Sequence, residues 1–196
     1  SGFEVENTAE SSRSYSSVWN NNSPGSDHAR SMIDSEKAWC AGRCDSSQWM
    51  KIDLGTSQLL VGAVFQGRHD SCHGQYVKSI NIAVSTDDQT WKTVEKEADI
   101  SGAKGDSQAQ VLFHTAVQGR FIRFSPKQWN EHISMRAAVL VGNTVSAGYW
   151  CGSNAAGGSD DFYIGAEFER PVTVKGIVLK QHLPRSLRAI STGEEG

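Results

Sequence analysis

The sequence predicts an all-β fold, a sandwich or barrel of short strands, on three observations. Apolar residues alternate with polar ones over short runs, which is the two-residue period of a half-buried strand. Turn-forming residues follow most of these runs, and no stretch sustains a helical apolar stripe for three turns. Several short strands at such spacing are typical of a sandwich or a barrel.

The expected strands follow one another through the middle of the chain. In residues 79–85, Ile80, Ile82 and Val84 share one face, and the turn at Asp87 and Asp88 then leads to Trp91. The other predicted strands are residues 49–54, ended by Gly55; residues 60–66; residues 121–124, ended by Pro126; and residues 135–141, ended by Gly142. Residues 4–17 are expected to form a loose arm or an edge strand.

A second β unit is predicted at the C-terminal end, because part of the pattern recurs. Trp39-Cys40 and the strands that follow it have an echo at Trp150-Cys151, and each copy separates its two strands by 13 positions: Trp49 to Gly62, and Tyr163 to Gly176. Equal spacing favours a repeated supersecondary unit over a chance likeness between hairpins. We therefore expect a first domain over residues 1–143 and an incomplete second unit, or a C-terminal extension, over residues 144–196.

The composition restricts the class of protein. The chain has 196 residues and a formal net charge of −3, so the strongly basic balance that suits nucleic-acid binding is absent. No apolar run approaches the roughly 20 residues needed to span a bilayer, and the N-terminus does not have the pattern of a signal peptide. We expect the chain to be part of a larger multidomain protein.

Cysteines and a glycosylation sequon favour an extracellular setting. The chain has four cysteines, Cys40, Cys44, Cys72 and Cys151, an even number that permits disulfides. Asn21 begins the sequon Asn21-Asn22-Ser23 and is the predicted glycosylation site. Together these features predict a secreted or cell-surface protein.

Residues 16–142 resemble the discoidin domain, the module of the coagulation-factor C domains. Each shared motif is weak alone, but together and in this order they are specific: AR at 29–30, AWCA at 38–41, QWMKIDLG at 48–55, QGR at 66–68, YVKS at 76–79, STDDQTW at 85–91, GRFIR at 119–123, PKQWN at 126–130 and MR at 135–136. The resemblance implies a jelly-roll β-sandwich with three ligand-binding loops, or spikes, at one end. Many members join their first and last residues by a disulfide, but here no cysteine precedes Cys40 and Asn143 follows Gly142.

Large aromatic and charged residues in the predicted strands are expected to be architectural. Aromatic side chains fill the core of a sandwich, and those expected to do so here are Trp49, Phe65, Trp91 and Phe124. Arg123 and Arg136 also lie in strands, and we expect them to pair with carboxylates such as Asp53, because buried charges must be paired.

The resemblance places the spikes at residues 18–27, 34–47 and 68–75. Loops on a rigid sandwich are where binding residues concentrate. Trp19 is expected to stack on a sugar or enter lipid, or else to fold back onto the core. The predicted ligand-binding residues are Trp19, Asn20, Asn21, Asn22, Asp45, Arg68, His69, Asp70 and His73.

The resemblance also brings the second and third spikes together, which predicts a disulfide between Cys44 and Cys72. A zinc site built from Cys40, Cys44, Cys72 and His69 or His73 is the rival interpretation. Zinc is disfavoured because Cys40 and Cys44 are spaced too widely and no second close cysteine pair exists. No metal or other cofactor is predicted, with a structural calcium ion left open.

The sequence predicts a non-catalytic recognition or adhesion module that binds a glycan or an extracellular protein receptor through its spikes. No nucleophile elbow, metalloprotease helix or phosphate-binding glycine loop is present in the sequence. Peripheral binding to anionic phospholipid is a weaker alternative, since Trp19 has mostly polar neighbours and membrane insertion needs apolar and basic groups together. A structural assembly domain, whose spikes touch a second copy, is the third interpretation.

Overall fold

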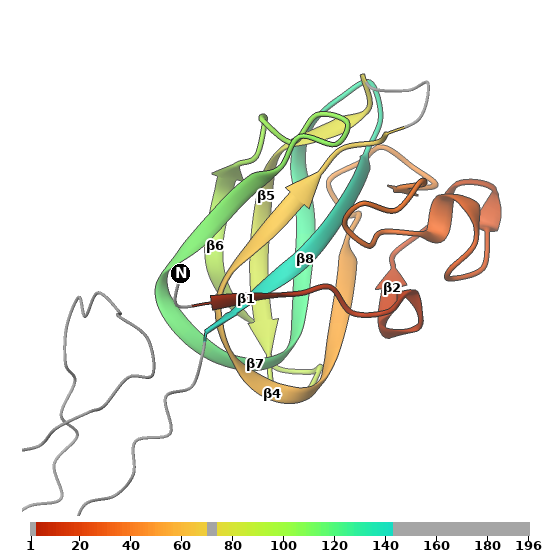
Figure 1. The fold of residues 1–196 in the computed structure, drawn as a ribbon. Helices are drawn as coiled ribbons and strands as arrows, with labels where there is room; N and C mark the ends of the chain where they lie inside the picture. Colours follow the sequence, from red (N-terminus) through yellow and green to blue (C-terminus); the bar gives the residue numbers. More distant parts are fainter. Residues whose placement is uncertain (1–2, 70–73, 143–196) are drawn as a thin grey trace, which may run out of the picture. The chain divides into compact units, whose positions relative to one another are not determined.

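The computed structural model describes residues 3–69 and 74–142, and Figure 1 shows their arrangement. Asp70, Cys72, His73 and the predicted second unit at residues 144–196 lie outside the described residues. Over the described part the chain is built from β-strands and three single turns of 3-10 helix, which confirms the all-β prediction. No described helix has the length and apolar character needed to cross a membrane.

Eight strands form the framework. They are β1 (Phe3–Glu6), β2 (Arg13–Tyr15), β3 (Trp39–Cys40), β4 (Met50–Gln66), β5 (Tyr76–Ser85), β6 (Lys92–Asp99), β7 (Ala109–Asn130) and β8 (Ser134–Gly142). The helical turns η1 (Glu10–Ser12), η2 (Trp19–Asn21) and η3 (Asp27–Ala29) all lie in the N-terminal part of the chain.

Two predicted strand ends are wrong, because the chain bends there without leaving the sheet. The strands predicted at residues 49–54 and 60–66 form the single strand β4, which continues through Gly55 in the left-handed region at φ 76°. Strand β7 likewise continues past Pro126 to Asn130. The pairing of β5 with β7 shifts register beside Pro126, and such an irregularity accommodates a residue that cannot donate to the ladder.

The two long strands β4 and β7 fold the sheet over on itself. They pair with each other along both halves, with a register shift between Asp53 and Gln58, and Figure 1 shows both curving round the lower end of the domain. The hydrogen-bonded order is β1-β8-β4-β7-β5-β6, with β2 beside β4 and β3 beside β8. The bend brings the two halves of the sheet face to face, which is a β-sandwich.

The core lies between these two halves. Phe65 and Phe124 are fully buried and meet edge to face with ring centroids 5.1 Å apart, as expected. Trp49 and Trp91 are only half-buried and lie outside the strands, so the expectation that they sit in core strands is wrong. Among the described residues, the fully buried tryptophan is Trp39, whose ring stacks on Tyr15 with centroids 5.6 Å apart.

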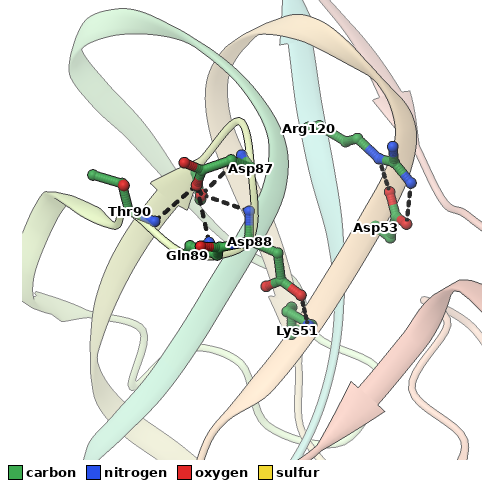
Figure 2. Close-up of polar contacts among 8 residues, drawn as sticks. Lys51, Asp53, Asp87, Asp88, Gln89, Thr90 and Arg120 are labelled. Carbon is green, nitrogen blue, oxygen red and sulfur yellow. Dashed lines mark hydrogen bonds and ion pairs between the residues drawn. The ribbon is translucent and has the colours of Figure 1, made fainter.

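The strand arginines pair only in part as expected, since Arg136 does contact a carboxylate, that of Asp106, at 2.9 Å. Asp53 accepts two bonds, at 2.7 and 2.8 Å, from Arg120 (Figure 2), rather than from Arg123 or Arg136. The Arg123 guanidinium lies 4.4 Å from the Trp91 ring centroid instead. Because alternate residues of a strand point to opposite faces, neighbouring arginines meet different partners.

The turn between β5 and β6 is held by one carboxylate, that of Asp87. It accepts bonds from the backbone N–H of Gln89 at 2.9 Å and of Thr90 at 2.7 Å, and from the Ser85 hydroxyl at 2.9 Å (Figure 2). Bonds to the charged form favour it, led by the one from Thr90, and they lower the pKa of Asp87 to about 2. The neighbouring Asp88 pairs with Lys51 of β4 at 2.5 Å, which ties the turn to the sheet.

Candidate functional site

The candidate site lies on the loops that carry the first two predicted spikes and the start of the third. The first loop includes η2 and η3, shown in red to orange in Figure 1. The second lies between β3 and β4, and the third begins after β4. The sandwich anchors each loop, since β3 pairs with β8 and β4 pairs with both β7 and β8.

Trp19 projects from the first loop and is 47% exposed, so it is not folded into the core. One edge contact is made, with His132, at a centroid distance of 5.6 Å and an interplanar angle of 85°. Because His132 lies in the connection between β7 and β8, this contact holds the indole against the sandwich while leaving much of its surface in solvent.

The three asparagines after Trp19 divide into two roles. Asn20 and Asn21 are exposed and adopt left-handed backbone angles, φ 57° and 52°, which asparagine tolerates better than most residues. Asn22 Oδ1 and His28 Nδ1 share a bond of 3.0 Å inside the loop. Asn20 and Asn21 therefore face solvent, whereas Asn22 braces the loop.

A groove of about 640 Å³ runs beside Trp19. It brings Trp19, Asn20 and Asn21 of the first loop together with residues of the second loop. The groove is lined by Ser16, Ser17, Val18, Trp19, Asn20, Asn21, Gly42, Arg43, Ser47 and Gln48. Its volume is in the range of about 300–1,000 Å³ that is usual for small-molecule sites.

Asp45 supports this groove from within the second loop. Its Oδ1 accepts bonds from the Ser47 N–H at 2.9 Å, from the Ser47 hydroxyl and from Gln48 Nε2 at 3.0 Å. These bonds, that of the Ser47 hydroxyl first, hold the pKa of Asp45 below its ordinary value. Asp45 does not line the groove, and it shapes the loop that does.

Gln48 joins the two loops, a role that was not predicted from the sequence. The buried side chain accepts bonds at Oε1 from the hydroxyls of Ser16 at 2.8 Å and Ser17 at 2.5 Å. Ser17 in turn accepts a bond from the Gly42 N–H at 3.0 Å. The sequence did indicate that Gln48 is buried. Gln48, Met50 and Ile52 are alternate residues, so in an extended chain their side chains point to the same side, and all three are buried.

A second, smaller hollow of about 250 Å³ is lined by Trp19, His28, Cys40, Arg68, Gln75 and His132. Arg68 donates from a terminal guanidinium nitrogen to Gln75 Oε1 at 3.0 Å. Burial, followed by the nearby charges of Arg68 and His28, lowers the pKa of His132 despite a bond with the Ile133 carbonyl. His28 and His132 gave no signal in the sequence, since each is an isolated histidine.

His69, a predicted ligand-binding residue, contacts another loop of the protein. Its Nδ1 contacts Asp106 Oδ2 at 2.5 Å, and it lines neither hollow. Asp106 Oδ1 also accepts a bond of 2.9 Å from Arg136, which is the main reason that the pKa of Asp106 is lowered. His69 thus joins the third loop to the loop between β6 and β7.

The described cysteines leave the predicted disulfide untested. Cys44 is exposed, and its predicted partner Cys72 lies outside the described residues. Cys40 is buried and accepts a bond of 3.3 Å from the Ser134 hydroxyl. Within residues 3–69 and 74–142, no group of three or more histidine, cysteine, aspartate or glutamate residues is placed to hold a metal ion.

Comparison with known families gives one match that covers most of the chain. The sequence model of the F5/8 type C domain matches residues 7–139. Bovine lactadherin is 34% identical over 110 residues, which are 53% of this chain and 26% of lactadherin. A discoidin-1 chain of Dictyostelium discoideum is 28% identical over 148 residues, which are 70% of this chain and 58% of that protein.

Solved structures agree on the fold. Discoidin II of Dictyostelium discoideum superposes with a TM-score of 0.51 at 20% identity, covering 66% of this chain and 53% of that chain. An F5/8 type C domain from Bacteroides fragilis superposes with a TM-score of 0.59 at 13% identity, covering 72% and 97%. The chain spans about a quarter of lactadherin and somewhat more than half of the discoidin-1 chain.

Proposed function

The chain belongs to the F5/8 type C domain family, and on that premise we propose that it is a non-catalytic recognition module that binds a glycan through the loops around Trp19. One observation carries the proposal. An exposed tryptophan, fixed at one edge by His132, stands beside a groove lined by amide and hydroxyl side chains. Such a site needs little further ordering to accept a ligand.

The chemistry of the groove suits a sugar better than an apolar molecule. The face of an indole ring packs well on the C–H face of a sugar ring, and amides and hydroxyls exchange hydrogen bonds with sugar hydroxyls. Asn20 and Arg43 supply donors or acceptors along the groove. A module of a chitosanase/glucanase that is described as chitosan-binding shares the fold at 19% identity and a TM-score of 0.50. That likeness concerns the fold alone, so the proposal rests on the groove.

We place this module outside the cell, as one domain of a larger secreted or cell-surface protein. The sequon at Asn21 supports this setting, since Asn21 is exposed and can accept a glycan. The relatives are longer than this chain, which accords with a domain that tethers other domains. A protein receptor is the second ligand class that this end of the sandwich suits.

Anionic membrane binding is the rival function, and the exposure of Trp19 is the observation that favours it. Tryptophan is common at membrane interfaces, and Arg43 is exposed on the adjacent loop. Single apolar anchors bind weakly, however, and the other residues of the groove are mostly polar.

A glycan array probed with the wild-type chain and with Trp19→Ala tests the proposed function. We expect a defined set of glycans to bind the wild type and to lose at least tenfold in affinity with the variant, as loss of a stacked aromatic implies. Trp91→Ala is the matched control, because it removes a half-buried tryptophan from the turn before β6 and should leave binding unchanged. An array without hits, or equal binding by Trp19→Ala, would contradict the proposal.

A further inference from the structure

Two exposed apolar side chains lie outside the groove beside Trp19. Val5 is 53% exposed and Leu112 is 59% exposed. Val5 of β1 pairs with Leu140 of β8. Gly62 of β4 pairs on one side with Leu140 and on the other with Leu112. Directly opposite residues of paired strands point to the same face, and Leu140 belongs to a small cluster separate from the main core. Val5 and Leu112 therefore lie on one outer face of the sheet.

The β1 end of this face is remote from the groove. β3, which leads into the second loop, pairs with Ser134 and Met135 at the start of β8. β1 instead pairs with residues 139–142 at the end of β8. A strand rises about 3.3 Å per residue, so roughly 16 Å separate Met135 from Leu140 along β8. The groove and β1 are thus different parts of the surface.

The hydrogen-bonded order of the strands ends at β1 on one side and at β6 on the other, and these two edges differ. β6 pairs with β5 through two register shifts, holds Glu97 at φ 47° and carries Lys92 and Lys96. Bulges and lysines are devices by which edge strands avoid pairing with another chain. β1 pairs with β8 in one uninterrupted register and has no lysine or proline. Among the described strands none lies on the other side of β1, so this edge can accept a further strand.

β1 alternates apolar and acidic side chains. Phe3 and Val5 lie on the outer face, and Glu4 and Glu6 point to the opposite face. Neither β1 nor residues 139–142 of β8 include a basic residue. No ion pair joins Glu4 or Glu6 to another described residue. The edge therefore suits a strand with basic side chains opposite the glutamates and an apolar side chain opposite Val5.

The same alternation disfavours a second copy of the chain at this edge. Two antiparallel β1 strands related by a twofold axis pair residues of the same face. Glu4 would then lie opposite Glu4 or Glu6 of the other copy. Like charges directly opposite each other destabilise a sheet. The charge of β1 thus favours a basic segment from a different protein.

We propose that β1 accepts an extended segment of a partner protein as a further strand of the sheet, and that this segment alternates basic and apolar residues. Main-chain hydrogen bonds hold the segment on β1, its lysine or arginine side chains face Glu4 and Glu6, and an apolar side chain packs beside Val5. Because β1 has four residues, the ladder is short and the side chains decide which segment binds. This interaction does not use the groove and is independent of the proposed function.

The test uses a short fluorescent peptide that alternates lysine and valine, titrated against the full chain and followed by fluorescence anisotropy. Three further probes are compared with it. One has the same composition in scrambled order, one alternates glutamate and valine, and one has methylated backbone nitrogens that cannot donate hydrogen bonds. We expect the lysine–valine peptide to bind at least tenfold more tightly than each of the three. Trp19→Ala should bind it as the wild type does.

Two pairs of variants locate the binding. Val5→Lys, which gives β1 the lysine of a protected edge, should weaken binding of the peptide at least tenfold. Leu112→Lys is its matched control, because Leu112 is similarly exposed on the same face but lies on β7, and its variant should leave binding unchanged. Glu4→Lys and Glu97→Lys alter the net charge equally, and only Glu4→Lys should weaken binding, about fivefold.

Thermal unfolding of each variant checks that the fold persists. Glu4 is exposed, so its variant tests the proposal even if Val5→Lys disturbs β1. Equal binding of the lysine–valine and scrambled peptides, or equal losses in Val5→Lys and Leu112→Lys, would overturn strand addition at β1. A tight dimer in sedimentation that Val5→Lys dissociates would show that a second copy occupies the edge, and would also overturn the proposal. Absence of glycan binding would overturn the proposed function and leave this inference standing.

Discussion

The indole of Trp19 meets the imidazole of His132 edge-on, at 5.6 Å and 85°, although the two residues come from opposite ends of the described chain. His132 also lines the smaller hollow with His28 and Arg68. One side chain from the β7–β8 connection therefore determines where the exposed aromatic ring of the first loop stands.

This contact is expected to depend on pH. Burial and the charges of Arg68 and His28 place the pKa of folded His132 below that of the unfolded chain. The contribution of neutral His132 to stability is therefore present above the ordinary histidine pKa of about 6.5. It is lost as the pH falls through the lower pKa that His132 has in the folded chain. We expect the fluorescence of Trp19 to change over that acidic interval. His132→Gln should abolish the Trp19 component of the transition, and a transition that persists in this variant would contradict the prediction.

Gln48→Ala should destabilise the chain by about 2 kcal/mol, because it removes the acceptor of two serine hydroxyls inside the protein. Groove binding should weaken as well, since the two loops lose their link. Urea unfolding measures the first effect and glycan titration the second. Gln89→Ala is the control, as Gln89 is exposed and uses its backbone N–H to reach Asp87. Equal stability of the two variants would show that Gln48 does not join the loops.

Arg136→Met should lower the free energy of unfolding by about 3–5 kcal/mol, which is the usual effect of removing one partner from a buried charged network. The fully buried guanidinium donates to the carbonyls of Ser35 at 2.8 Å, Gly67 at 3.0 Å and Gly105 at 2.8 Å. The same change at Arg123, half-buried on Trp91, should cost no more than about 1 kcal/mol. Chemical denaturation of both variants measures the two losses of stability. A larger loss for the Arg123 variant would contradict the prediction that Arg136 contributes more.

The Asp87 turn should give the protein an acid-sensitive stability. The pKa of Asp87 is about 2 in the folded chain and near 4 when unfolded, so its contribution is present above pH 4 and is lost as the pH falls toward 2. Asp87→Asn should flatten the fall in melting temperature over that interval. Thr86→Ala, a change at an exposed neighbour, should leave it unaltered. Melting temperatures that fall equally with pH in the wild type and in Asp87→Asn would refute this prediction.

The disulfide between Cys44 and Cys72 stays a prediction. It would enclose 27 intervening residues and contribute roughly 3 kcal/mol in the simple loop-entropy model. Reduction is then expected to weaken ligand binding more than it destabilises the sandwich, whose core lies elsewhere. Peptide mapping without reductant decides the pairing. A bond between Cys40 and Cys44, or four reduced thiols, would refute it.

Local patterns in the sequence were enough to predict strand segments within β4, β5, β7 and β8, and the core-facing side of the segment at residues 79–85. Ile80, Ile82 and Val84 alternate as a half-buried strand must, and all three are buried in the structure. The Asp87–Asp88 turn was readable in the same way, because the carboxylate of Asp87 bonds groups within three residues of itself. Such features depend on neighbours along the chain, which the sequence displays directly.

Only the tertiary structure decided three other features. These are the half-buried positions of Trp49 and Trp91, the partners of the arginines, and the contact of Trp19 with His132. Each depends on which residues of distant segments face each other once β4 and β7 bend and pair. Asp53 meets Arg120, and not Arg123, through the register of that pairing and the faces on which the side chains emerge. A sequence read locally does not specify register between distant strands, because register follows from packing the whole core.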